Sequence, residues 1–61
     1  MSELPGELAD ALDAAPDAKA AFEALPPSHR REYVQWLAEA KKPETRVSRA
    51  EKAVQRLRGQ A

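Results

Sequence analysis

The neighbours Ser28 and His29 are the residues whose types come nearest to catalytic chemistry, because an imidazole can activate a serine hydroxyl as a nucleophile. The two prolines before them predict that both residues lie at the start of a helix, where adjacent side chains do not face each other. We therefore interpret Ser28 as a helix N-cap and His29 as a packing residue at the edge of an apolar face. We expect no catalytic residues.

Metal and phosphate chemistry are also disfavoured by the composition. The sequence has no cysteine and one histidine, which argues against zinc and redox sites. Its carboxylates are scattered singly, and with Gly6 and Gly59 as its only glycines it has no glycine-rich phosphate loop. We expect no bound metal, no cofactor and no enzymatic activity.

A basic stripe is the most informative chemical feature of the sequence. Thr45, Arg49, Lys52 and Arg56 recur at i, i+4, i+7 and i+11, which places them along one side of a helix. Like charges at this spacing oppose folding by about 0.2–0.5 kcal/mol per pair. We expect the acidic first part of the chain, together with the position of Arg56 and Arg58 near a helix C-terminus, to offset this repulsion. The alternative is an external anion or an acidic partner surface.

Two further side chains have both a structural and a binding interpretation. Arg46 lies between the basic stripe and the apolar face, where we expect it to bond to a carboxylate or to a carbonyl at the end of the preceding helix. Trp36 could anchor a partner, but we expect it to anchor the core instead. The candidate residues for binding a partner or an anion are all in the second half of the chain: Arg30, Arg31, Thr45, Arg46, Arg49, Lys52 and Arg56.

The elements that must position these residues are delimited by prolines at positions 5, 16, 26, 27 and 43. They predict helices over residues 5–14 and 16–24, a third from Pro27 or Ser28, and a fourth over 43–58 with Gly59 as a C′ residue. The fold class predicted is all-α, a compact domain of three to four helices without strands.

Each predicted helix has one apolar face. The residues expected to face inward are Leu4, Leu8, Ala11, Leu12, Ala18, Ala21, Phe22, Leu25, Tyr33, Trp36, Leu37, Ala40, Val47, Ala50, Val54 and Leu57. A chain of 61 residues has room for one core, so we expect a single helical domain over residues 1–61.

The formal net charge of zero conceals two halves of opposite charge. Residues 1–26 are alanine-rich and contain six acids and one lysine, whereas residues 27–61 contain nine bases and four acids. The halves therefore carry net charges of −5 and +5. They should attract each other, and either could steer a partner of opposite charge.

The run LPPSHRREYVQWLAEAKKPETRVSRAEKAVQRL, from Leu25 to Leu57, resembles the C-terminal helical module of the YdeI-like, OmpD-associated family of bacteriocin-protection proteins. The resemblance rests on residues 25–33, 39–41 and 44–46 together with Trp36 and Arg49. The sequence departs from the family pattern at Ser48, where the family has a base, and at Ala50, where it has a larger aliphatic residue. Many relatives also carry a preceding β-rich domain, which is absent from this sequence.

The resemblance implies a helical module associated with tolerance of antimicrobial peptides or envelope stress, without agreed catalytic residues. We therefore expect a small interaction module that binds another protein through charged helical faces. The alternative is a module that binds nucleic acid or phosphate with the basic face of its last two helices, which the zero net charge disfavours. We expect a cytoplasmic monomer without a membrane-spanning segment, because the apolar runs are only two or three residues long.

Overall fold

The computed structural model describes residues 4–59, which form four α-helices and no strand. Glu3, one of the acidic residues counted above, lies outside this range. The helices are α1 (Gly6–Asp13), α2 (Pro16–Ala24), α3 (Pro27–Ala38) and α4 (Pro43–Gly59). The predicted all-α fold class is confirmed, and each predicted helix is present with boundaries close to those expected. None of the described helices is both long and apolar enough to cross a membrane.

Proline sets three of the four helix starts directly, since Pro16, Pro27 and Pro43 are each the first residue of a helix. A proline at this position lacks only an N–H that the helix would leave unbonded. The expectation that Ser28 is the N-cap of α3 is wrong. The carbonyl of Pro26 accepts from the backbone N–H groups of His29 and Arg30 at 3.0 and 3.1 Å, so the N-cap is Pro26, two residues earlier, and no side chain caps the helix.

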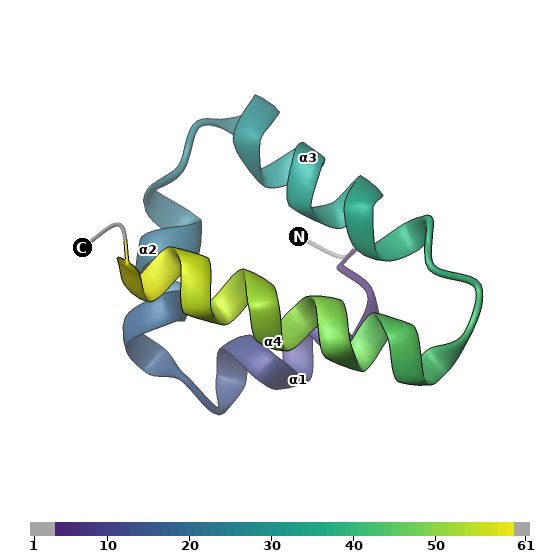
Figure 1. The fold of residues 1–61 in the computed structure, drawn as a ribbon. Helices are drawn as coiled ribbons and strands as arrows, with labels where there is room; N and C mark the ends of the chain where they lie inside the picture. The colour runs from purple at the N-terminus through teal and green to yellow at the C-terminus, as the bar shows by residue number, and fades with distance from the viewer. Residues whose placement is uncertain (1–3, 60–61) are drawn as a thin grey trace.

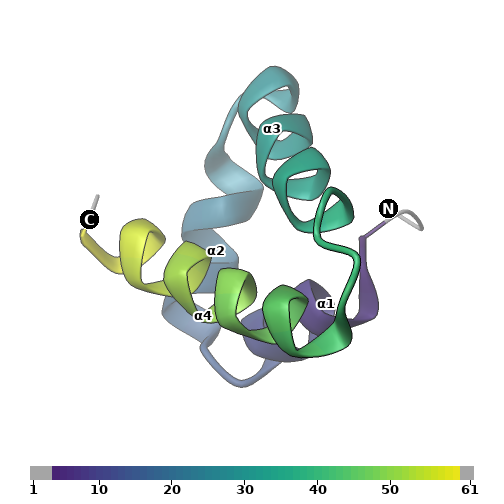
Figure 2. The ribbon, with the colours of Figure 1, turned by 45° about the vertical axis from the view of Figure 1, so that its right-hand side comes forward.

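The helix α4 is the central element and contacts each of the other three helices. In Figures 1 and 2, α3 lies on the upper side of the molecule and α1 on the lower side, while α2 carries the chain from one side to the other. The helices α3 and α4 run in opposite directions, because only the short segment 39–42 connects them (Figure 1). The two helices come together near this connection and diverge toward the start of α3 (Figures 1 and 2).

One hydrophobic cluster fills the space between the helices. Its largest fully buried side chains are Leu8, Leu37 and Leu57. The other buried members, most of them small, are Leu12, Ala15, Ala18, Phe22, Ala50, Ala53 and Val54. Alanines at these positions let the helix backbones approach closely, which suits a chain with few large apolar residues.

Trp36 packs against this cluster but is only half-buried, so its predicted role as the central core anchor is wrong. The neighbouring Leu37 points into the interior and is fully buried, and the larger indole lies at the edge of the core. Val47, also expected inside, is 48% exposed, because it lies beside the hollow between α1 and α4 rather than under a helix.

Gly59 was expected just beyond α4 in the left-handed conformation that often ends a helix. It is instead the last residue of α4, and its φ is not positive. The last turn of the helix therefore has no glycine cap of that kind. Arg56 and Arg58 lie in this turn, where positive charge interacts favourably with the helix dipole.

Candidate functional site

Arg46 joins the start of α4 to the end of α3. Its Nε donates a hydrogen bond to the carbonyl oxygen of Ala40 at 2.9 Å, and its Nη1 lies 4.0 Å from a carboxylate oxygen of Glu7 on α1. Both kinds of partner were expected for this residue, and the structure contains both. Arg46 therefore acts as a connection among α1, α3 and α4.

Arg49 makes a second connection to the same end of α3. Its Nη1 donates to the carbonyl oxygen of Trp36, and its guanidinium lies 5.5 Å from the centroid of the Trp36 ring. The last carbonyls of a helix lack backbone partners within that helix, and the N–H of Ala40 bonds to Leu37 rather than to Trp36. Arg49 thus supplies a donor to a carbonyl at the C-terminal end of α3.

Arg56, two turns further along α4, repeats the pairing of arginine with an aromatic ring. Its guanidinium lies 5.9 Å from the centroid of the Tyr33 ring. Tyr33 also contacts α2, where its ring meets that of Phe22 edge to face at a centroid distance of 6.2 Å. Tyr33 lies one turn before Trp36 on α3, whereas Arg56 lies two turns after Arg49 on α4. The two arginine–ring pairs therefore follow one another in opposite directions along the two helices.

A surface cavity of about 390 Å³ lies beside these rings, and we call it the aromatic groove. Its lining residues come from the end of α2, from α3 and from α4: Leu25, His29, Glu32, Tyr33, Trp36 and Arg56. Leu25, Tyr33 and Trp36 are each half-buried and give the groove an apolar surface. His29, Glu32 and Arg56 are exposed and give it a polar margin.

The remaining candidate residues do not converge on one place. Arg31 and Lys52 are exposed, and Thr45 is half-buried near the start of α4. Arg30 is half-buried on the α2 side of α3, and its Nε is inaccessible without a hydrogen-bond partner. Of the seven residues proposed from the sequence, the structure therefore brings Arg46, Arg49 and Arg56 into the contact between α3 and α4.

The repulsion within the basic stripe is offset differently from the expectation. In the described residues, the acidic first half pairs with Arg46, through Glu7, and with Arg58, through a 3.0 Å contact to Asp17. Arg49 and Arg56 face aromatic rings and a carbonyl instead. The hydrogen bond from Arg58, aided by the backbone N–H of Ala18, holds the pKa of Asp17 below its ordinary value.

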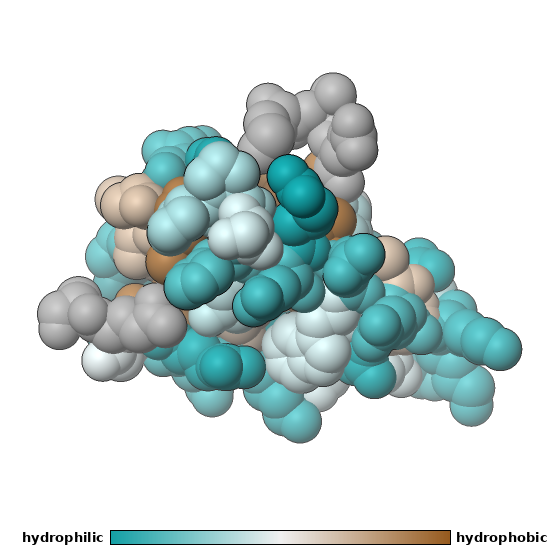
Figure 3. Space-filling model, turned by 90° about the horizontal axis from the view of Figure 1, so that it is seen from above, coloured by the Kyte–Doolittle hydropathy of each residue, from teal (hydrophilic) through white to brown (hydrophobic). Residues whose placement is uncertain are grey.

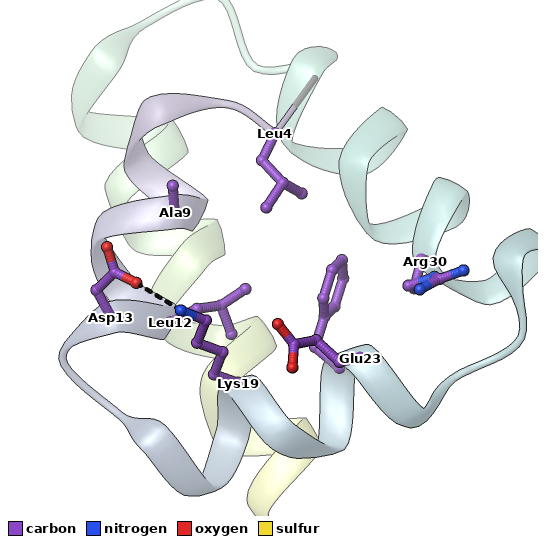
Figure 4. A pocket seen from close by; sticks show the side chains of 8 residues that line it. Leu4, Ala9, Leu12, Asp13, Lys19, Glu23 and Arg30 are labelled. Carbon is purple, nitrogen blue, oxygen red and sulfur yellow. Dashed lines mark hydrogen bonds and ion pairs between the residues drawn. The ribbon is translucent and has the colours of Figure 1, made fainter. Parts of the chain in front are cut away.

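A second cavity, of about 520 Å³, opens between α1, α2 and α3 (Figure 4). Leu4, Leu12 and Phe22 form its apolar walls, and Lys19 reaches across its margin to Asp13 at 3.2 Å. The remaining charged residues of its lining are Glu23 and Arg30. Lys19 and Asp13 are already paired with each other, so two of the four charges of this cavity are engaged within the module.

Tyr33, Leu25 and Glu32 are the members of the aromatic groove that the sequence did not identify as a site. The sequence predicts Tyr33 and Leu25 as core residues and gives no specific role to Glu32. The signal that could have identified the groove is the spacing of two aromatic residues on α3 opposite two arginines on α4 across a short connection. In residues 4–59, no group of three or more potential ligands is placed to hold a metal ion.

Fold and site together describe a small helical module with one arginine-covered aromatic face. A family model described as "Bacteriocin-protection, YdeI or OmpD-Associated" matches residues 1–59. The chain belongs to this family, which confirms the resemblance. It is 44% identical over 54 residues to the uncharacterized protein YdeI of Bacillus subtilis (strain 168). The aligned region covers 88% of this chain and 27% of that protein, so the chain spans about a quarter of its relative's length. No solved structure matches the chain significantly.

Proposed function

We propose that the chain is a non-catalytic module that binds another protein through the face formed by α3 and α4. The observation that supports this most directly is the aromatic groove, in which the half-buried rings of Tyr33 and Trp36 lie beside Arg56. Tyrosine, tryptophan and arginine are the residue types that most often dominate binding energy at protein interfaces. The family description connects this class of protein with protection from bacteriocins, and we assign the chain a binding role in that process.

The mostly polar surface of the module supports a specific contact rather than a general hydrophobic one. Seen from above, the molecule is mostly hydrophilic, with hydrophobic side chains exposed in small patches between polar ones (Figure 3). Protein interfaces combine apolar contacts with polar ones, and the groove presents side chains of both kinds. The arrangement of Ser28 and His29 also supports a non-catalytic role. The exposed Ser28 forms no hydrogen bond with His29, which lines the groove, so the imidazole is not placed to activate the serine hydroxyl.

Photo-crosslinking in the native host tests this proposal. A benzophenone amino acid replaces Glu32, which lines the groove, and in a matched control it replaces Glu44, which is exposed at the start of α4. We expect a protein adduct from position 32 that protease removes and nuclease leaves intact, and no such adduct from position 44. Equal protein adducts from both positions, or none from position 32, would contradict the proposal.

The same experiment distinguishes the nucleic-acid alternative. An adduct from position 32 that nuclease removes would favour that alternative over protein binding. A titration against random duplex DNA then provides an independent measurement, since neutralisation of phosphates makes binding weaken steeply as salt is raised. We expect no binding to DNA at physiological salt.

A further inference from the structure

The aromatic groove has the chemical features needed to select one kind of partner, and this inference rests on the proposed function. Its apolar surface comes from Leu25, Tyr33 and Trp36, and it has room for large side chains at about 390 Å³. That volume lies within the range of pockets that enclose small ligands. An apolar side chain entering the groove would cover ring surface that is exposed in the isolated module.

Arg56 is placed to bind a carboxylate at the margin of the groove. Its guanidinium lies over the Tyr33 ring, and in residues 4–59 it forms no ion pair and no side-chain hydrogen bond. A stacked guanidinium keeps its N–H edge free, and that edge fits a carboxylate through two parallel hydrogen bonds. Lys52, one turn earlier on α4, is exposed and adds positive charge on the same stripe.

Charge complementarity over a wider area points the same way. Residues 27–61 have a net charge of +5, and two acids of the first half, Glu7 and Asp17, are engaged with Arg46 and Arg58 of α4. An acidic partner approaching the α3 and α4 side therefore meets a favourable field. Acidic side chains on the partner would also relieve the repulsion within the basic stripe.

We propose that the aromatic groove binds an acidic amphipathic segment of a partner protein, with a large apolar side chain against Tyr33 and Trp36 and a carboxylate on Arg56. Glu32 explains why the occupant is a peptide rather than a nucleic acid. A nucleic acid carries a negative phosphate at every nucleotide, and the Glu32 carboxylate would repel it. A peptide can instead place a neutral side chain opposite Glu32.

Fluorescence of Trp36, the sole tryptophan of the chain, measures binding at this groove. The probes are three blocked synthetic helical peptides without aromatic residues. The first has leucines along one face and glutamates flanking them, the second has lysines in place of the glutamates, and the third has serines in place of the leucines. We expect the first peptide to shift the Trp36 emission and to bind at least about tenfold more tightly than either of the others.

Variants of the full chain connect this binding to named residues, with circular dichroism as the check of folding. Arg56→Glu should abolish binding of the acidic peptide, and Arg56→Lys should weaken it severalfold, because lysine keeps the charge without the two-pronged geometry. Glu32→Gln should strengthen binding by removing the opposing carboxylate. Arg58→Gln is the matched control and should leave binding unchanged, because Arg58 is paired with Asp17 and lies outside the groove.

Equal binding of the acidic and basic peptides would overturn this inference, as would binding that Arg56→Glu leaves intact in a folded protein. If none of the peptides binds while crosslinking from position 32 yields a protein adduct, the inference fails and the proposed function stands. If the acidic peptide binds but position 32 yields no protein adduct, the groove chemistry is as inferred and the proposed function fails. The two experiments therefore distinguish failure of this inference from failure of the proposed function.

Discussion

Replacing Arg49 with methionine should destabilise the module because it removes two contacts while keeping an unbranched apolar stem. The first contact is the hydrogen bond to the Trp36 carbonyl, and a bond from a charged donor contributes about 1.5–3 kcal/mol. The second is the placement of the guanidinium over the Trp36 ring, worth about 0.5–1 kcal/mol at a partly exposed site. Because Arg49 is only half-buried, we expect a total loss of about 2–3 kcal/mol.

Thermal unfolding followed by circular dichroism measures this loss. For a domain of this size, it corresponds to a decrease in Tm of about 10–20 °C. Both partners of Arg49 are uncharged, so the decrease should be nearly the same at about 0.05 M and about 0.5 M salt, although the latter screens exposed charges strongly. Lys52→Met, which replaces an exposed base on the same helix, is the control and should change stability by less than about 0.5 kcal/mol.

Two results would refute this reasoning. If Arg49→Met melts within a few degrees of the wild type, the contacts with Trp36 do not stabilise the fold. If the decrease in Tm is large at low salt and disappears at high salt, Arg49 is held by carboxylates, as expected from the sequence alone, and not by the end of α3.

Three further outcomes are expected. Leu37→Ala should cost about 2–5 kcal/mol and abolish cooperative melting, whereas Trp36→Leu should leave a folded protein, because Leu37 is fully buried and Trp36 is not. Ser28→Ala should leave Tm unchanged in thermal melts, since no side chain caps α3. The depressed pKa of Asp17 means that its pairing with Arg58 stabilises the fold above the ordinary aspartate pKa of about 4 and is lost as the pH falls through the folded value. Asp17→Asn should therefore reduce the difference in Tm between pH 7 and acidic pH, and an unchanged pH profile would contradict this.

The helices were predictable because their signals are local. The preference of proline for the first position of a helix follows from the chemistry of that residue alone. The 3.6-residue periodicity correctly identified Leu8, Leu37 and Leu57 as core residues. The connection made by Arg46 was also predictable, since the residue lies near the start of α4, directly after the end of α3. In each case the evidence is confined to a short stretch of chain.

The exposure of Val47 and the partners of Arg49 and Arg56 could not be predicted, because they depend on how the helices pack against one another. Val47 shares a helix face with buried residues of α4, but no helix covers it, and periodicity indicates a direction without showing what lies there. The partners of Arg49 and Arg56 depend on the register between α3 and α4. The charge distribution predicts carboxylates of the first half as partners of these arginines. The packing of α3 on α4 instead places aromatic rings beside them.

The attachment of α3 at one end has a consequence for local unfolding. Arg49 bonds to a carbonyl near its C-terminal end and Arg46 to one just beyond it, and Leu37 is buried there, while most of residues 27–32 are exposed. Segments with few buried contacts open at a lower free energy than the rest of the fold. The first turns of α3 should therefore exchange their amide hydrogens sooner than residues 34–38. A segment bound in the aromatic groove would contact this early-opening part of α3, so binding should slow the exchange there even without a change in average structure.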